Sequence, residues 1–125
     1  MGYGQSANDP SVRGGGHIHI NVDSIYLEGE ESHIRANGGP DEDGYDSKDK
    51  NGGSGGYVYI KTQNTLKPNT FDEKSSIEAK GGRGHYNGFG GSGGIIIFEG
   101  DAMDDHYYRL KDICKANGGS PGSGI

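Results

Sequence analysis

The distribution of glycine constrains the fold of this chain more than any other feature. Glycine makes up 26 of the 125 residues, a content usually associated with low-complexity or disordered chains. Only Gly29 and Gly100 fall within three segments rich in β-forming residues, 17–36, 57–79 and 95–116, and the other 24 of the 26 glycines lie between them. A disordered chain has no reason to sort its glycine in this way. A repeat with structured and connecting parts does.

Three repeats can be aligned on a glycine-rich start that is followed by an alternating strand. The phrases are GGGHIHINV (14–22), GGYVYIKT (55–62) and GGIIIFEG (93–100). The alignment predicts strands that begin at His17, Tyr57 and Ile95. We therefore expect these three residues to stack as one row, with His19, Tyr59 and Ile97 as the next row.

A second anchor ends each repeat. It reads SHIRANGG (32–39), SSIEAKGG (75–82) and DICKANGG (112–119). The anchor aligns one row of apolar residues and one row of alanines: Ile34, Ile77 and Cys114, then Ala36, Ala79 and Ala116. The A-[NK]-G-G that follows supplies residues suited to a sharp corner.

Alternation assigns the faces, because successive side chains of a strand point to opposite sides. The expected core row consists of Ile18, Ile20, Val22, Val58, Ile60, Ile96 and Phe98. The middle segments add further core candidates on short strands: Ile25, Leu27, Leu66, Phe71, Tyr108 and Leu110. The residues that begin the strands, together with Tyr26, are expected to face outward.

The β-rich part of each repeat is 20 to 23 residues long, which is too short for a four-stranded propeller blade. It suits one turn of an all-β, right-handed parallel β-helix, because parallel crossovers are right-handed and about three stacked turns bury a common core. We therefore expect one solenoid segment over 1–125, with coils 17–36, 57–79 and 95–116. The glycine-rich excursions would be 1–16, 37–56, 80–94 and 117–125, where glycine lets backbones approach closely.

The GG-S-GG starts followed by Ile/Val-rich strands, and the I-x-A-[NK]-G-G ends, resemble the Gly-rich parallel β-helix repeats of large secreted or cell-surface proteins. These are adhesin-like chains of pectin-lyase-like architecture. The resemblance implies a stiff rod that holds a protein away from a surface or assembles into fibres, and hence an extracellular or cell-surface location. Both ends of the chain read as interrupted repeats, which predicts a fragment of a longer protein.

Charge and hydropathy exclude several classes of function. The formal net charge is −6, and the sequence has no local Lys/Arg cluster, so we expect no nucleic-acid partner. No apolar run approaches the ~20 residues of a membrane helix. The first ten residues lack a charged start followed by an apolar core, so this chain shows no signal peptide.

Pectin-lyase-like architecture includes polysaccharide-cleaving enzymes, whose motifs can be compared with this sequence. The stretch DDHYYRLK (104–111) is reminiscent of the D-D and R-I-K elements of polygalacturonases. The match fails, because no N-x-D occurs and the GHY at 84–86 precedes the Asp pair. Adjacent residues of a strand point to opposite faces, so Asp104 and Asp105 would not act as an acid–base pair. We expect no enzymatic activity.

Two groups of residues have metal-ligand chemistry. The loop PDEDGYDSKDKNGG (40–53) supplies the Ca²⁺ candidates Asp41, Asp43, Asp46 and Asp49. Its spacing does not match an EF-hand or a calcium β-roll, so a solvated acidic loop is the alternative. His17 and His19 share a strand face, with exposed imidazoles beside an aromatic row as the alternative to a metal site. We expect no other cofactor.

The aromatic residues are the remaining candidates for contact with a ligand or partner. They are Tyr45, Tyr57, Tyr59, Tyr86 and Phe89. Tyrosine offers an apolar face with a polar edge, which suits stacking on a sugar or a protein; the alternative is that the excursions fold back and bury these rings. The sequence thus predicts a non-enzymatic structural or adhesive segment of an extracellular assembly or fibre. Its partners would be other copies, the rest of a longer chain or a glycan. The alternative is a carbohydrate-binding or polysaccharide-cleaving module.

Overall fold

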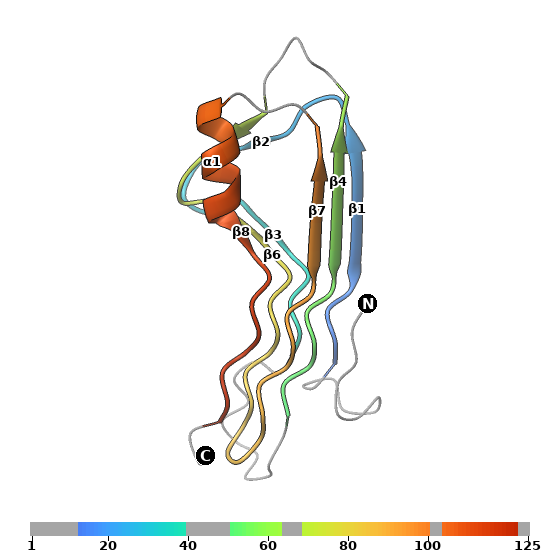
Figure 1. Cartoon of the computed structure of the whole chain (residues 1–125), viewed down its shortest axis with the longest axis vertical. Helices are drawn as coiled ribbons and strands as arrows, with labels where there is room; N and C mark the ends of the chain where they lie inside the picture. The colour runs from blue at the N-terminus through green and yellow to red at the C-terminus, as the bar shows by residue number, and fades with distance from the viewer. Residues whose placement is uncertain (1–12, 40–50, 64–68, 101–103, 123–125) are drawn as a thin grey trace.

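The computed structural model describes residues 13–39, 51–63, 69–100 and 104–122. The strands in this part of the chain are β1 (His17–Val22), β2 (Tyr26–Leu27), β3 (His33–Arg35), β4 (Tyr57–Thr62), β5 (Thr70–Phe71), β6 (Ser76–Glu78), β7 (Ile95–Glu99) and β8 (Cys114–Lys115). One helix, α1 (Asp104–Ile113), lies between β7 and β8. The strands form three parallel sheets, with the orders β1-β4-β7, β2-β5 and β3-β6-β8 (Figure 1).

Each sheet takes its strands from successive repeats, and the predicted parallel pairing is confirmed. The aligned rows are His17–Tyr57–Ile95, His19–Tyr59–Ile97 and Ile34–Ile77–Cys114. A register error of one residue would have exchanged the inner and outer faces of every strand. The repeat alignment therefore fixes both the pairing and the faces.

The predicted fold class, a right-handed parallel β-helix of three coils, is wrong. The strands form three small separate sheets, and none of them closes or continues as a solenoid wall. The middle sheet has only β2 and β5, each two residues long, because the third repeat has α1 in the corresponding place. The described parts of the glycine-rich segments contribute no strand to the three sheets.

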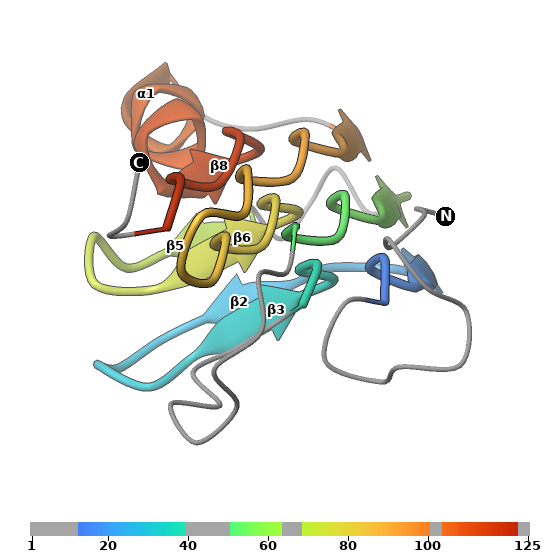
Figure 2. The same ribbon diagram turned by 90° about the horizontal axis from the view of Figure 1, so that it is seen from below.

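Helix α1 forms because the third repeat lacks the β-branched residues of a strand over 104–112 and spaces its apolar residues for a helix. Leu110 and Ile113 lie three positions apart and are 7% and 2% exposed, which places both on one face. Two Asp residues begin the helix, and Lys111 lies in its last turn, as the helix dipole favours. The helix contacts β5, β6 and β8 and so covers the third-repeat side of the molecule (Figure 2).

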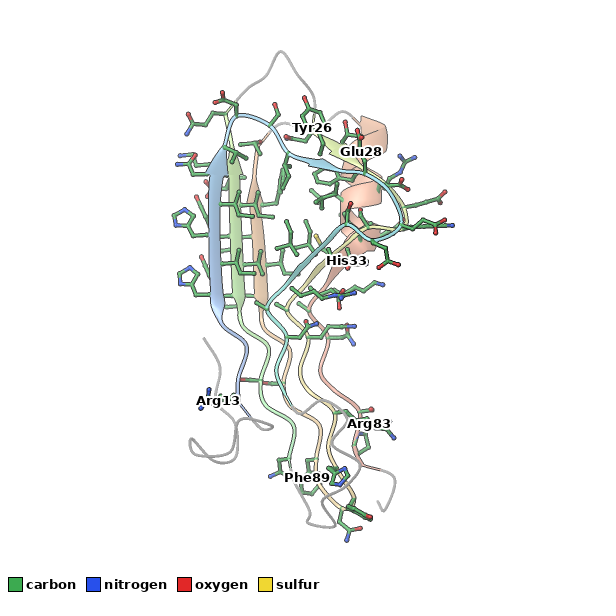
Figure 3. All side chains as sticks on the ribbon, turned by 180° about the vertical axis from the view of Figure 1, so that it is seen from behind. Arg13, Tyr26, Glu28, His33, Arg83 and Phe89 are labelled. Atoms are coloured by element: carbon green, nitrogen blue, oxygen red, sulfur yellow. The ribbon has the colours of Figure 1, made fainter. Side chains whose placement is uncertain are left out.

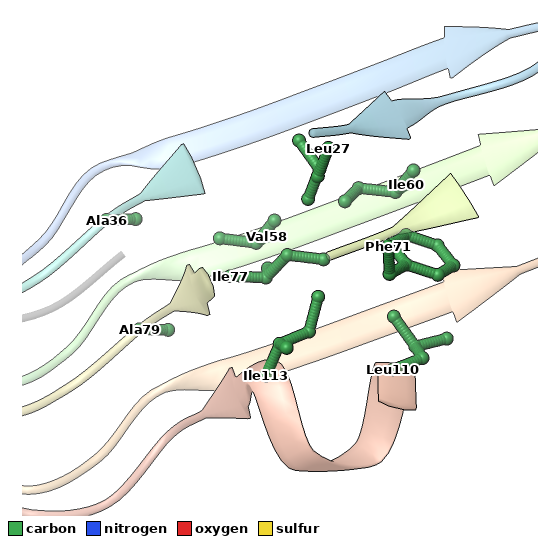
Figure 4. Packing of buried hydrophobic residues seen from close by; sticks show 9 residues of the cluster. All are labelled: Leu27, Ala36, Val58, Ile60, Phe71, Ile77, Ala79, Leu110 and Ile113. Carbon is green, nitrogen blue, oxygen red and sulfur yellow. The ribbon is translucent and has the colours of Figure 1, made fainter. Parts of the chain in front are cut away.

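The hydrophobic core lies between the sheets and α1 (Figure 4). Its buried members are Leu27, Ala36, Val58, Ile60, Phe71, Ile77, Ala79, Leu110 and Ile113. The flanking strands contribute partly buried residues that pack on this cluster: Ile18, Ile20, Ile25, Ile34, Ile96, Phe98 and Cys114. The inward faces are therefore as predicted, and they are fully buried only in the middle repeat.

One predicted core residue is exposed. Val22 is 38% exposed at the end of β1, which has a neighbour on one side only. Its partner in β4 is Thr62, and β7 ends at Glu99 without a third residue in this row. Val22 therefore lies at the end of an edge strand, with only the polar Thr62 beside it. Leu66 lies outside the described residues, as does the side chain of Tyr108.

The described parts of the predicted excursions run side by side away from the sheets (Figure 1). Their backbones hydrogen-bond to one another: the Gly82 N–H donates to the Gly53 carbonyl at 2.8 Å, and the Gly91 N–H donates to the Gly82 carbonyl at 2.9 Å. A Cβ atom placed on Gly82 would lie 2.1 Å from the Gly39 carbonyl oxygen. The close backbone approach expected of the glycines is thus confirmed, and the segments form a glycine layer that no other residue type could build.

Candidate functional site

The outward side of the β1-β4-β7 sheet presents a regular group of ring and aliphatic side chains. We call it the outer face, and it consists of His17, His19, Tyr57, Tyr59, Ile95 and Ile97. Strand pairing places these residues in two rows of three. Neighbouring strands lie ~4.8 Å apart, so each row presents His, Tyr and Ile at an even spacing.

The rings of the outer face touch edge to face. The centroids of His17 and Tyr57 lie 4.8 Å apart with an interplanar angle of 85°. Those of His19 and Tyr59 lie 4.9 Å apart at 87°, and the two imidazoles are nearly parallel at 6.4 Å. Edge-to-face contact is a preferred geometry of aromatic pairs. It fixes the tyrosine rings and leaves part of each ring open to solvent.

The residues of the outer face differ in their exposure. Ile95 and Ile97 are 56% and 36% exposed, both histidines are exposed, and both tyrosines are half-buried. The described parts of the glycine-rich segments pack on one another. Among the described residues, these tyrosine rings contact their row neighbours, His17 and His19.

Tyr59 also has a polar anchor. Its hydroxyl donates a hydrogen bond to Glu99 Oε2 at 2.6 Å. This hydrogen bond raises the pKa of Tyr59, with burial and the negative charge of Glu99 acting in the same direction. The phenol therefore stays neutral and keeps its oxygen as an acceptor at the edge of the outer face.

The other two predicted aromatic contacts lie elsewhere. Phe89 is 66% exposed and Tyr86 is 44% exposed, and Phe89 lies at the end of the glycine layer farthest from Tyr26 (Figure 3). Tyr86 has φ +52° in a turn closed by a hydrogen bond from the Gly88 N–H to the His85 carbonyl. Its ring meets that of His85 edge to face at 4.6 Å. The structure thus divides the predicted contacts between two surfaces, and Tyr45 lies outside the described residues.

The Ca²⁺ candidates Asp41, Asp43, Asp46 and Asp49 also lie outside the described residues. Among the residues that the structure describes, no group of three or more His, Cys, Asp or Glu side chains is arranged to hold a metal ion. His17 and His19 are exposed and contact the tyrosine rings. Their arrangement is that of imidazoles beside an aromatic row.

The Asp pair and the cysteine both occupy structural positions. Asp104 and Asp105 form the first turn of α1, in place of the predicted strand. Cys114 is a free thiol that aligns with Ile77 in the β3-β6-β8 sheet. Burial raises its pKa to about 11, so the thiol is protonated at neutral pH and is a poor nucleophile.

Sequence reasoning missed a polar network around Glu78, whose side chain is only 6% exposed. Its Oε2 accepts hydrogen bonds from Ser76 Oγ at 2.5 Å and Arg35 Nε at 2.8 Å. Its Oε1 accepts from Asn37 Nδ2 at 3.2 Å and contacts Lys80 Nζ at 2.9 Å. Burial opposes ionisation, but the hydrogen bonds outweigh it and hold the pKa of Glu78 well below its usual range.

A signal for this network was present in the repeat alignment. The position between the Ile/Cys row and the Ala row is Arg35 in the first repeat, Glu78 in the second and Lys115 in the third. The register of the β3-β6-β8 sheet aligns these three residues. An acid between two bases at equivalent positions predicts a charged row once the repeats are known to stack.

In the described part of the chain, no helix has the length and apolar character needed to cross a membrane. The chain was also compared with protein-family models, curated proteins and solved structures, and none of the three comparisons finds a match. The functional assignment therefore depends on the surfaces of the protein itself.

Proposed function

We propose that this chain is a non-enzymatic structural and adhesive segment of an extracellular or cell-surface assembly, and that it adheres to polysaccharide through the outer face. The observation that carries the proposal is the pair of His-Tyr-Ile rows held in register on an exposed sheet. Tyrosine and histidine combine apolar ring faces with polar edges, which suits sugar rings. Their rotamers are already fixed by edge-to-face contacts, which lowers the entropic cost of binding.

The glycine layer supports the structural half of the proposal. Its backbones are cross-linked by hydrogen bonds, and at glycines such as Gly82 and Gly91 a Cβ atom would clash with the neighbouring backbone. Such close backbone packing stiffens the segment. The carboxylate content of the sheet supports the non-enzymatic half, because Glu99 is the only acid within β1, β4 and β7. Glycoside cleavage ordinarily requires two.

The free strand edges suggest how the segment joins its assembly. Within the described residues, β1 and β7 each pair with a single neighbour, so each leaves one row of backbone groups for a further strand. We propose that other copies, or more of a longer chain, continue the sheet at these edges. Sedimentation velocity at micromolar concentration tests this part, and a stable monomer at every concentration would contradict self-association.

Retention on insoluble polysaccharide tests the adhesive part. The purified chain is mixed with cellulose or with chitin, and the bound fraction is measured as a function of polymer concentration. Tyr59→Ala should weaken retention about fivefold, since a stacked aromatic contributes roughly 1 kcal/mol. Tyr26→Ala is the matched control, because Tyr26 is 50% exposed on β2, away from the outer face.

Both variants are checked by circular dichroism so that a loss of folding is not counted as a loss of binding. Equal retention of Tyr59→Ala and Tyr26→Ala would contradict the role of the outer face. So would the failure of the unsubstituted chain to bind either polymer.

A further inference from the structure

The β3-β6-β8 sheet carries a basic surface on the side that faces away from the core. Ile34, Ile77 and Cys114 form its inward row and pack on the hydrophobic cluster. The next row along the strands therefore points outward, and it aligns Arg35 with Glu78 and Glu78 with Lys115. Arg35 and Lys115 lie two strand spacings apart, or about 9–10 Å between backbones.

The negative charge of Glu78 is neutralised by neighbouring cations. The carboxylate lies beneath Arg35 and Lys80, with contacts of 2.8 and 2.9 Å, and its remaining acceptor sites are used by Ser76 and Asn37. A buried carboxylate with these partners stays ionised, so it neutralises one positive charge and offers no free oxygen to a ligand.

Three cations remain around this one anion. Arg35, Lys80 and Lys115 contribute three positive charges and Glu78 one negative charge, which leaves a local net charge of +2 in a chain of formal net charge −6. The side chains of Arg35 and Lys80 are 53% and 38% exposed, and Lys115 is exposed. We call these three residues the basic face.

The cations of the basic face are suited to bind oxyanions. Arg35 contacts Glu78 through Nε, so its two terminal amino groups are not needed for that ion pair and can bind a carboxylate or sulfate. Two acids precede β3: Glu30 Oε1 lies 2.7 Å from Lys74 Nζ, and Glu31 is exposed with its Oε2 3.9 Å from His33 Nε2.

We propose that the basic face is a second binding site, and that its ligand is an acidic polysaccharide bound through carboxylate or sulfate groups. Charge complementarity selects an anionic polymer, and one feature favours a polysaccharide over a nucleic acid. Strands β3, β6 and β8 carry no Tyr, Phe or Trp on which bases could stack. This site is independent of the outer face, so either proposal can fail alone.

Affinity electrophoresis tests the proposal with two soluble probes, alginate for carboxylates and dextran sulfate for sulfates. Lys115→Glu should weaken binding to the preferred probe by at least about tenfold, because it replaces an attraction with a repulsion. Lys61→Glu changes the net charge by the same amount on the β1-β4-β7 sheet, and it should change binding less than about twofold. Raising the salt concentration should weaken binding of the unsubstituted chain.

Lys115 makes no contact with Glu78 in the network described above, so Lys115→Glu leaves those hydrogen bonds in place, and circular dichroism verifies its fold. Binding to only one probe identifies the anionic group and supports the site. Equal losses in Lys115→Glu and Lys61→Glu would overturn it, as would no binding to either probe at low salt. Tighter binding to a single-stranded DNA oligonucleotide than to both polysaccharides would also overturn the assignment of the ligand.

Discussion

Replacement of Gly82 by alanine should destabilise the protein strongly, whereas the same replacement at Gly16 should not. Gly82 is buried in the glycine layer, and its new Cβ would lie 2.1 Å from the Gly39 carbonyl oxygen. That oxygen belongs to the backbone, so no side-chain rotation relieves the clash. Gly16 is exposed and has no atom within 4 Å of the corresponding position.

The magnitude follows from the hydrogen bonds of Gly82. Contacts of a Cβ below 3.0 Å are essentially never seen, so the neighbouring backbones must separate by about 1 Å. Hydrogen bonds of 2.8 and 2.9 Å would then exceed about 3.5 Å and be lost. Two lost hydrogen bonds cost about 1 kcal/mol each, and overpacking adds about 1–3 kcal/mol.

Both substitutions also change the unfolded state, and this change favours folding. Alanine restricts the unfolded chain more than glycine and thereby stabilises a protein by about 0.4–1 kcal/mol where the native backbone accepts it. The net change in the free energy of unfolding is therefore a loss of about 3 kcal/mol for Gly82→Ala. For Gly16→Ala it is a gain of up to about 1 kcal/mol, since Gly16 does not have a positive φ.

Urea denaturation followed by circular dichroism measures both variants against the unsubstituted chain. The same chemical change should shift the midpoint in opposite directions at the two positions. If the two free energies of unfolding agree within about 0.5 kcal/mol, the close packing of the glycine layer is refuted. A change in the slope of the transition in Gly82→Ala would indicate that the layer unfolds as a separate unit.

Three further predictions concern the core, the Glu78 network and the thiol. Phe71 is fully buried, so Phe71→Ala should lower the free energy of unfolding by about 3–5 kcal/mol in urea; a loss as small as that of the exposed Tyr26→Ala, about 0.5 kcal/mol, would contradict the packing. The lowered pKa of Glu78 means that its stabilisation is present above its unfolded pKa of about 4.3 and is lost as the pH falls through the folded value. Glu78→Gln should therefore cost about 2 kcal/mol at pH 7 and progressively less in acid, and a cost independent of pH would contradict the network. The pKa of Cys114, raised from 9.0 to about 11, implies that iodoacetamide at pH 8 should react about 100-fold more slowly with the native than with the urea-unfolded chain; equal rates would show an accessible thiolate.

The pairing of the strands could be predicted from the sequence because the information is local and repeated. Alternation assigns each strand two faces, and the glycine-rich start sets the same first residue in every repeat. A shift of one residue would move Val58 and Ile60 to solvent, so the register has no close competitor. The same argument placed Tyr57 and Tyr59 on an exposed face.

The fold class could not be predicted in this way, because it depends on how the repeats end and join. Alignment with the first two repeats suggested a strand for the middle of the third, whereas Leu110 and Ile113 have helical spacing and pack on β5 and β6. Glycine frequency indicated close backbone approach, but it did not show that the glycine-rich segments would pack on one another away from the sheets. Val22 looked apolar enough for the core and is exposed at the end of the edge strand β1, where its neighbour is the polar Thr62.

The sequence by itself determined which residues align in rows. The tertiary structure determined which charged side chains those rows bring together on one surface. Arg35, Lys80 and Lys115 are separated by 45 and 35 residues along the chain, and no local run of the sequence contains a cluster of basic residues. Stacking brings them around the single carboxylate of Glu78. The Coulomb interaction depends on distance in space and not on separation along the chain, so a basic surface exists on a protein whose composition is acidic.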